Sequence, residues 1–222
     1  MPIRLPALAA FALVALVLPA TPHAQTRGTL HVAALRSGPP GGTPGASEPV
    51  FALGLGGGIE HALALPAPAA LRLGLGFALA PTGRSEIQLF TDAEGEIVGE
   101  FSITTRPLYL TATPSVALQL ARGPVQPYVV AGPVGAVKLG ERTSQTDGLS
   151  ELDLQARTTD VYPDRTTGAT AGVGVHVPGA FPLGALRVEI RATRLAGRAD
   201  ATPEFRDRTA QRTVELQLGL AL

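Results

Sequence analysis

The stretch Thr167–Val177 has the sequence TGATAGVGVHV, in which apolar side chains recur at every second position. Successive side chains of a β-strand point to opposite faces, so a two-residue period gives a strand two different faces. One face of this stretch carries alanine and valine, and the other carries glycine, threonine and one histidine. The stretch therefore predicts a β-strand with an aliphatic face and a face of small or polar residues.

The same period returns in six further segments, and no segment of ten or more residues beyond the N-terminal leader has helical spacing. Residues 125–139 alternate poorly, and they are predicted as an eighth strand from their β-branched content and their neighbours. The fourth segment changes phase along its length, since Phe101 falls out of step with Leu108. We expect a β-bulge near Arg106 and Pro107 to join its two parts. The eight predicted strands cover residues 28–36, 51–60, 71–79, 101–119, 125–139, 167–177, 186–193 and 213–220.

The connections between the predicted strands alternate between long and short. Short turns rich in Pro, Gly and Ala cover residues 65–69, 121–124 and 178–182, whereas longer polar connections cover residues 37–48, 80–98, 140–165 and 197–208. An up-and-down antiparallel barrel with both termini at the short-turn end has this order of connections. A parallel sheet is excluded because it needs helical crossovers.

The orientation of the strands distinguishes a membrane barrel from a soluble one. The interior of an eight-stranded barrel is just wide enough for side chains to fill, so four or five large aliphatic residues per strand would overfill it. The opposite face is mostly Gly, Ala and Thr, with too few charges for a solvated surface. Aliphatic stretches such as Leu108–Leu118 match the roughly 9–11 residues with which a tilted strand crosses a bilayer.

These observations predict an all-β fold, an eight-stranded antiparallel up-and-down transmembrane β-barrel. A closed barrel is suited to lipid because it leaves no backbone polar group unpaired. The first alternative is a soluble exported lipocalin-like barrel that binds a small apolar ligand, with the aliphatic side chains pointing inward.

If the aliphatic face points outward, the barrel lumen receives three acidic and three basic side chains. A buried charge is costly unless it is paired, so equal numbers favour a closed and packed interior. We expect Tyr109, Gln119, His176 and Gln217 to fill the space around the charges, and such a filled lumen argues against a wide pore. The predicted lumenal ion-pair network consists of Glu60, Arg72, Arg187, Glu189, Arg191 and Glu215.

The N-terminus and the composition indicate where the protein is located. Met1–Ala24 is predicted to be a secretory signal peptide, since Arg4 precedes the uncharged apolar run Ala7–Leu18, which is too short to span a bilayer as a helix. We expect cleavage near Ala24 and one outer-membrane β-barrel domain over residues 25–222. The chain has no Cys, which excludes a disulfide framework, and its 18 basic residues balance 18 acidic residues, which disfavours nucleic-acid binding.

In a hairpin in the middle of the chain, the strand that begins Leu108-Tyr109-Leu110 is followed by the turn Ala121-Arg122-Gly123 and the segment PYVVAGP at residues 127–133. This hairpin resembles the small outer-membrane β-barrel families of the OmpX and PorT-like kind. The last strand, Leu216–Leu220, is also similar to theirs. The chain departs from these families by ending at Leu222 rather than at an aromatic residue. The candidates for aromatic residues at the membrane interfaces are Phe51, Phe77, Phe90, Phe101, Tyr109, Tyr128 and Phe181.

The sequence predicts no catalytic residues, no cofactor and no metal site. His31, His61 and His176 lie on different predicted strands without ligand spacing, and no local Ser–His pairing is present. We therefore expect a structural or surface-interaction role and no enzyme. Because some small outer-membrane barrels modify lipid A, a lipid A-modifying barrel enzyme is the second alternative.

The expected partners are outer-membrane lipid and, through the long loops, lipopolysaccharide or a surface partner. The connections 80–98 and 140–165 are mildly acidic, which allows divalent cations to bridge them to lipopolysaccharide. The third candidate contact is with lipid phosphates, through Arg198, Arg206 and Arg208.

Overall fold

The computed structural model describes residues 25–38, 47–64, 69–91, 94–146, 162–181, 184–197 and 210–222. Within these residues, no helix is long and apolar enough to cross a membrane. The predicted signal peptide with its cleavage site, and Arg198, Arg206 and Arg208, lie outside the described residues. The described strands are β1 (Gln25–Gly38), β2 (Ser47–Ala64), β3 (Ala70–Pro81), β4 (Arg84–Thr91), β5 (Ile97–Gln119), β6 (Gln126–Thr146), β7 (Arg165–Phe181), β8 (Gly184–Leu195) and β9 (Gln211–Ala221).

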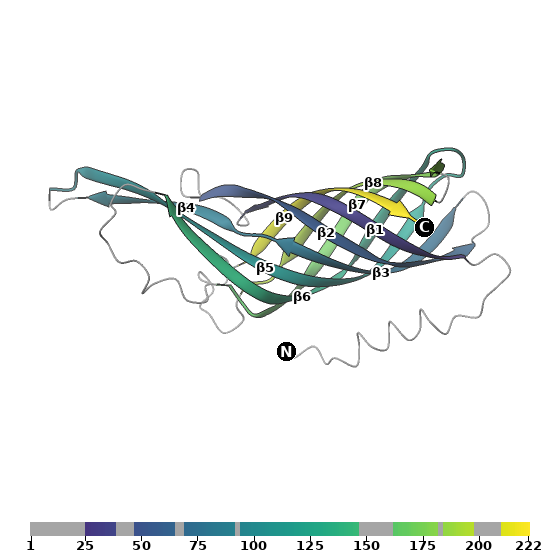
Figure 1. The fold of residues 1–222 in the computed structure, drawn as a ribbon, viewed down its shortest axis with the longest axis horizontal. Helices are drawn as coiled ribbons and strands as arrows, with labels where there is room; N and C mark the ends of the chain where they lie inside the picture. Colours follow the sequence, from purple (N-terminus) through teal and green to yellow (C-terminus); the bar gives the residue numbers. More distant parts are fainter. Residues whose placement is uncertain are drawn as a thin grey trace.

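The strands form one antiparallel sheet that closes on itself (Figure 1). β1 pairs with β2 along one edge and with β9, the last strand, along the other. β3 and β4 share one position in the barrel wall, because both pair with β5 in the same register: Pro81 lies opposite Leu108, and Arg84 lies opposite Thr105. Nine strand segments therefore build eight wall positions, and the predicted eight-stranded antiparallel barrel is confirmed.

The short break between β3 and β4 lies at Thr82 and Gly83. Gly83 has a φ of 143°, and a Cβ atom there would collide with the carbonyl oxygen of Thr105. Glycine is the residue that tolerates this backbone conformation. The break leaves the chain in the same wall position, so it interrupts the strand without changing the topology.

Two connections that the sequence predicts as long loops are partly strand. β4 lies inside the predicted connection 80–98, and β6 continues to Thr146, well into the predicted connection 140–165. With β5 they extend one end of the barrel beyond the rest of the wall (Figure 1). The β6 part of the extension is polar, with the segment ERTSQT at residues 141–146, whereas β4 also carries Ile87, Leu89 and Phe90. A ribbon outside the hydrocarbon needs no aliphatic face, so the hydrophobic period does not reveal it.

The predicted bulge in β5 near Arg106 and Pro107 is wrong, because the irregularity lies on the neighbouring strand. Leu108 and Tyr109 of β5 pair with Gly140 and Lys138 of β6, which leaves Leu139 as the extra residue. β5 itself keeps its odd-numbered side chains inward from Thr105 to Gln119. The phase change in the sequence therefore marks the start of the polar extension, where apolar side chains no longer have to face outward.

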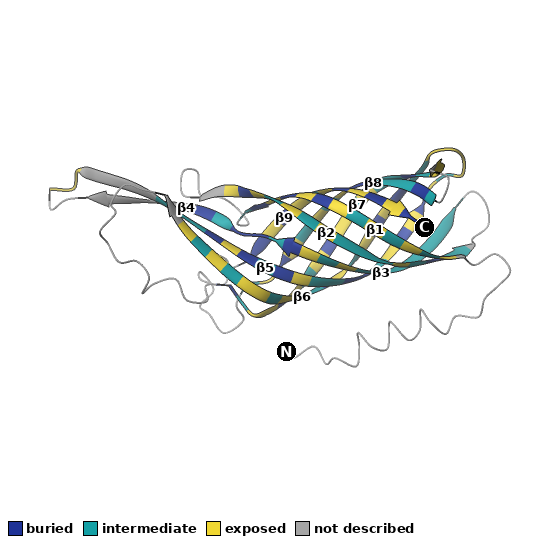
Figure 2. Cartoon of the chain, in the orientation of Figure 1, coloured by how far each residue is buried: buried dark blue, intermediate teal, exposed yellow. Residues whose placement is uncertain are grey.

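The predicted orientation of the aliphatic face is confirmed: large aliphatic side chains cover the outer wall. Leu53 is 80% exposed, Leu55 60% and Leu30 57%, whereas Glu189 is 1% exposed and His176 2%. Exposed and buried positions alternate along the strands in Figure 2. The outward set includes Val32, Phe51, Ile59, Phe77, Leu79, Leu110, Val116, Leu118, Val173, Ile190, Val214, Leu216, Leu218 and Leu220. A wall of this composition is suited to lipid and not to water, so the barrel is of the transmembrane type.

Candidate functional site: the charged lumen

Alternating positions of β8 supply the centre of a charged cluster inside the barrel. Arg187, Glu189 and Arg191 are spaced two residues apart, so all three side chains point into the lumen. The Glu189 carboxylate forms ion pairs with both arginines. Its Oε2 accepts a hydrogen bond from Nη2 of Arg187 at 2.6 Å, and its Oε1 accepts one from Nε of Arg191 at 2.5 Å. One buried carboxylate thus separates two guanidinium groups on the same strand, which would otherwise repel each other.

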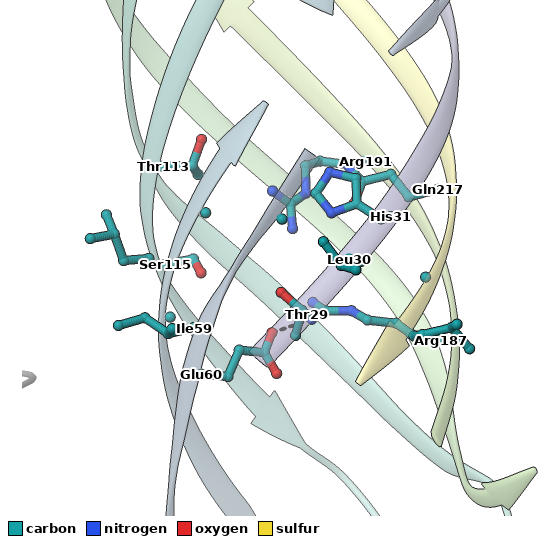
Figure 3. Close-up of a pocket in the computed structure, with 16 residues that line it drawn as sticks. Thr29, Leu30, His31, Ile59, Glu60, Thr113, Ser115, Arg187, Arg191 and Gln217 are labelled. Atoms are coloured by element: carbon teal, nitrogen blue, oxygen red, sulfur yellow. Dashed lines mark hydrogen bonds and ion pairs between the residues drawn. The ribbon is translucent and has the colours of Figure 1, made fainter. Parts of the chain in front are cut away.

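The cluster continues across the lumen to β2 and β3. Nη1 of Arg187 forms an ion pair with Oε1 of Glu60, and the other oxygen of Glu60 lies 4.0 Å from Nη1 of Arg72 (Figure 3 shows the contact between Glu60 and Arg187). The structure therefore links five of the six predicted residues in the order Arg72, Glu60, Arg187, Glu189 and Arg191. Because these residues come from β2, β3 and β8, the chain of charges joins opposite sides of the wall.

Glu215 is the predicted member for which no ion pair is found among the described residues. Its register partner on β8 is Arg191, but its carboxylate accepts a hydrogen bond from Nε2 of Gln217, on its own strand, at 2.8 Å. The expectation that all six residues would join through ion pairs therefore does not hold for Glu215. Its charge still lies beside Arg191, so it balances a cluster that otherwise holds three arginines and two glutamates.

Tyr128 of β6 is a member of the cluster that the sequence analysis misplaced. Its hydroxyl donates to Oε2 of Glu189 at 2.7 Å and accepts from Nε of Arg187 at 2.6 Å. The Arg187 guanidinium also lies 4.9 Å from the centre of the Tyr128 ring. Tyr128 is 2% exposed and Tyr109 is 0% exposed, so neither can belong to the interfacial aromatic residues for which they were candidates. Residues 125–139 carry similar small and apolar residues on both faces, so the pattern does not assign Tyr128 to one of them.

Of the other interfacial candidates, Phe51 and Phe77 face outward, at 69% and 49% exposed. The side chains of Phe90, Phe101 and Phe181 lie outside the part of the structure that is described. The outer wall therefore has two placed aromatic candidates.

Glycines on the inward face make room for the large polar side chains. A Cβ atom on Gly174 of β7 would lie 2.5 Å from the Tyr128 hydroxyl, and one on Gly56 of β2 would collide with the His31 ring. Real side chains do not approach this closely, so both positions require glycine as long as Tyr128 and His31 are present. The glycine-rich inner faces are thus the complement of the charged cluster.

Amides and an imidazole surround the Arg72 end of the cluster. Nη2 of Arg72 donates to Oε1 of Gln119 at 2.6 Å and to Oε1 of Gln126 at 3.3 Å, and it lies 3.3 Å from Nδ1 of His176. Gln119 and His176 therefore lie against the cluster, as the sequence analysis expected. These residues line a cavity of ≈ 320 Å³ at the short-turn end of the barrel.

Among the described residues, small spaces lie in the middle of the lumen. Two cavities of ≈ 40 and ≈ 50 Å³ lie there, and both are lined by His31, Arg191 and Gln217 (Figure 3 shows the smaller one). One water molecule occupies roughly 30 Å³ in the liquid, so each space holds about one.

A second polar cluster, which the sequence pattern does not predict, lies toward the long-connection end. Nζ of Lys138 lies 3.2 Å from Oε2 of Glu141 and 3.3 Å from Oδ1 of Asp164, and it donates to the carbonyl oxygen of Tyr162 at 2.8 Å. Tyr109, which was expected beside the ion pairs, instead donates to the carbonyl oxygen of Pro163 at 2.9 Å. The signal available in the sequence was that Lys138 is the single lysine of the chain and lies on a predicted transmembrane strand.

The three histidines of the barrel are separated by the fold. His61 occupies an outward position of β2 but is only 9% exposed, with its Nδ1 2.9 Å from Oγ1 of Thr26, whereas His31 and His176 face the lumen at different places. In the described part of the chain, no group of three or more His, Cys, Asp or Glu side chains is placed to hold a metal ion.

Comparison with known proteins gives similar folds but no family. No protein-family model and no curated protein matches the chain. Neisserial surface protein A has 14% sequence identity and a TM-score of 0.41, over 90% of this chain and 97% of that chain. Ail of Yersinia pestis, in complex with the heparin analogue sucrose octasulfate, has 12% sequence identity and a TM-score of 0.38, over 89% of this chain and 97% of that chain. The outer membrane enzyme PagL has 10% sequence identity and a TM-score of 0.43, over 86% of this chain and 97% of that chain. At these identities and TM-scores, the similarity transfers no activity, ligand or partner to this chain.

Proposed function

We propose that this chain is an outer-membrane β-barrel protein with a structural or surface-interaction role and a packed, charge-paired lumen. The observation that carries the proposal is the division of side chains between the two faces of one closed sheet. Aliphatic residues such as Leu53 and Leu218 cover the outer wall, and charged residues such as Arg187 and Glu189 fill the interior. The predicted export signal directs such a barrel to the outer membrane.

The soluble lipocalin-like alternative requires the opposite distribution of side chains between the two faces of the sheet. A soluble barrel that binds an apolar ligand would turn its aliphatic side chains toward the ligand and a polar face toward water. Here Leu53, Leu55 and Phe51 are at least 60% exposed, and the lumen carries ion pairs. A contiguous apolar wall of this size is not tolerated on a soluble monomer.

The packed lumen supports a barrel that does not conduct. The ion-paired chain from Arg72 to Arg191 crosses the interior, and the two cavities described at its centre measure ≈ 40 and ≈ 50 Å³. A role in supporting the envelope, or in presenting the long-connection end to a surface partner, needs no pore. The relation to the OmpX and PorT-like barrels is part of this proposal, and the β5–β6 hairpin with its short turn supports it.

The proposal assigns no catalysis to the barrel. Its support is the separation of His31, His61 and His176, because a hydrolytic site needs a base held beside a nucleophile. Mass spectrometry of lipid A from cells with and without the gene tests this part. We expect identical lipid A species, and loss of an acyl chain that depends on the gene would establish the enzyme alternative.

Gel mobility of the detergent-extracted protein tests the barrel itself. We expect the unboiled sample to migrate differently from the boiled sample, because a closed barrel resists detergent until it is heated. Identical mobilities would contradict the membrane barrel. Planar-bilayer recording of the same preparation tests the lumen, where we expect no stable channel, and a steady open conductance would contradict the packed interior.

A further inference from the structure

The described outer wall carries six exposed arginines near the long-connection end of the barrel. Each belongs to a different strand and occupies an outward-facing position, in phase with the aliphatic residues of that strand. We call this set the arginine collar. It consists of Arg36 on β1, Arg106 on β5, Arg142 on β6, Arg165 on β7, Arg194 on β8 and Arg212 on β9.

The collar marks the end of the apolar wall. On β5 the outward neighbour of Arg106 toward the barrel centre is Leu108, and on β9 the outward neighbour of Arg212 is Val214. On the other side of Arg106 the outward residue is Thr104, which begins the polar extension. The arginines therefore lie at the depth where hydrocarbon gives way to lipid headgroups, if the barrel spans the membrane as proposed above.

Within the collar, like charges face each other directly. Arg194 is the register partner of Arg212 across β8 and β9, and Arg106 is the register partner of Arg142 across β5 and β6. Directly opposite side chains on one face of a sheet are roughly 5 Å apart at Cβ, and like charges at such positions destabilise the pairing. Among the described residues, no salt bridge is found for any collar arginine. An anion held between the arginines would remove this repulsion.

In the lumen, the arginines are paired with acids of the chain itself. Arg72, Arg187 and Arg191 each lie within 4.0 Å of a glutamate oxygen. In the part of the chain that the structure describes, no acid pairs with a collar arginine, so an anion outside the barrel can serve as their counter-ion. A phosphate group is suited to the task, since guanidinium groups bind phosphate through two parallel hydrogen bonds.

One part of the collar also has a place for an acyl chain. Arg36, Arg212 and Arg194 lie on the adjacent strands β1, β9 and β8, and Arg212 pairs with Gly38, two residues beyond Arg36. Directly below, an open hollow of ≈ 470 Å³ runs along the outer wall. Its lining is apolar except for Arg36 and includes Ala34, Phe51, Leu53, Val214 and Leu216.

We propose that the arginine collar binds the phosphate groups of an anionic lipid in the leaflet at the long-connection end, and that Arg36, Arg194 and Arg212 with the hollow beneath them form its main site. The headgroup phosphate lies between the three guanidinium groups, and an acyl chain of the same lipid lies along the hollow. The inference rests on the transmembrane placement under Proposed function, but it concerns the outer wall and not the lumen or the loops.

Native mass spectrometry of the barrel, extracted from membranes and purified in a zwitterionic detergent, tests the site. The probes are lipid A with both phosphates and the same lipid after dephosphorylation. We expect the protein to retain the phosphorylated lipid, and R36Q/R194Q/R212Q to bind it on the order of 100-fold more weakly. Dephosphorylated lipid A is expected to bind weakly and equally to both proteins.

Two matched triple variants sharpen the test. R106Q/R142Q/R165Q removes as much charge from the side of the collar for which no such hollow is described, and we expect a smaller loss of binding. R36K/R194K/R212K keeps the charge but not the two-pronged hydrogen bonding, and we expect intermediate binding.

Three results would overturn the proposal: undiminished lipid binding by R36Q/R194Q/R212Q, equal binding of both lipids by the unaltered protein, or complete displacement of the lipid by millimolar inorganic phosphate. Heat-dependent gel mobility of every variant shows that the barrel is folded. If the unaltered protein itself lacks that mobility shift, the transmembrane placement fails, which is a different result from loss of lipid binding by a folded variant.

Discussion

Arginines of the lumen and arginines of the collar differ in one respect, which is the direction of the side chain. Arg187 and Arg191 point inward and share the buried Glu189, whereas Arg194, on the same strand, points outward and faces Arg212. On β8, the odd-numbered Arg187 and Arg191 form the lumenal ion pairs, and the even-numbered Arg194 belongs to the collar. The same residue type thus serves cohesion inside the barrel and lipid contact outside it.

The difference predicts how each region responds to mutation. A lumenal charge lies in a low-dielectric interior, so removing its partner leaves an uncompensated buried charge. A collar charge lies at the headgroup level, where water and ions screen it. Lumenal substitutions should therefore change stability, and collar substitutions should change lipid binding.

The largest effect is expected for Glu189→Gln. The substitution leaves Arg187 and Arg191 without their shared carboxylate, and it should lower the free energy of unfolding by about 3–5 kcal/mol. Urea unfolding in detergent micelles, with the folded fraction read from heat-dependent gel mobility, measures the change in the free energy of unfolding. Glu215→Gln is the control, because Glu215 is bonded to the neutral Gln217, and its cost should be clearly smaller. Equal costs for the two variants would contradict the ion-paired chain.

A large effect is also expected when a charge is added to the apolar wall. Leu218 lies in the middle of the outward run of β9, and Leu218→Arg should cost about 2–4 kcal/mol in a lipid bilayer. Val214→Arg places the same charge next to Arg212 at the rim and should cost about 0–1 kcal/mol. Unfolding in lipid vesicles measures both costs. A larger cost for Val214→Arg than for Leu218→Arg would contradict the placement of the membrane boundary near Arg212.

A moderate effect is expected where a glycine accommodates a lumenal side chain. Gly174→Ala brings a methyl group against the Tyr128 hydroxyl and should cost about 1–3 kcal/mol through overpacking. Gly135→Ala on β6 is the matched substitution, since its Cβ would have no atom within 4 Å, and it should be neutral or stabilising. Similar costs measured by the same unfolding assay would mean that the interior is looser than described.

The smallest effect on stability is expected in the collar. Arg194→Gln removes one member of a like-charged pair, so in zwitterionic detergent the free energy of unfolding should change by less than about 0.5 kcal/mol or rise slightly. Arg187→Gln, made on the same strand, should cost several times more. A collar substitution as costly as the lumenal one would remove the distinction between the two regions.

The sequence was sufficient to predict which face of each strand holds which residues. A two-residue period determines the face, and the volume of an eight-stranded barrel determines which face is inside, so the inward positions of Glu60, Arg187 and Glu189 followed directly. Where the period is weak the prediction failed, as for Tyr128, whose strand carries Val, Ala and Gly on both faces.

Partners across the lumen could not be predicted from the sequence. The period gives no information on height along the barrel axis, which depends on the stagger between all eight strands. For this reason the sequence could not show that Glu189 would receive two arginines while Glu215 accepts from Gln217, or that Lys138 would meet Asp164. The polar extension of β6 was missed because a strand outside the hydrocarbon does not need the aliphatic face by which strands were found.

Spin labelling along β9 tests the central claim, the orientation of the strands, most directly. The chain has no cysteine, so single cysteines at positions 214–220 can each be labelled without side reactions. In lipid vesicles, oxygen accessibility should be high for labels at Val214, Leu216, Leu218 and Leu220 and low for labels at Glu215, Gln217 and Gly219. High accessibility at the odd-numbered positions, or the absence of a two-residue period, would contradict the account.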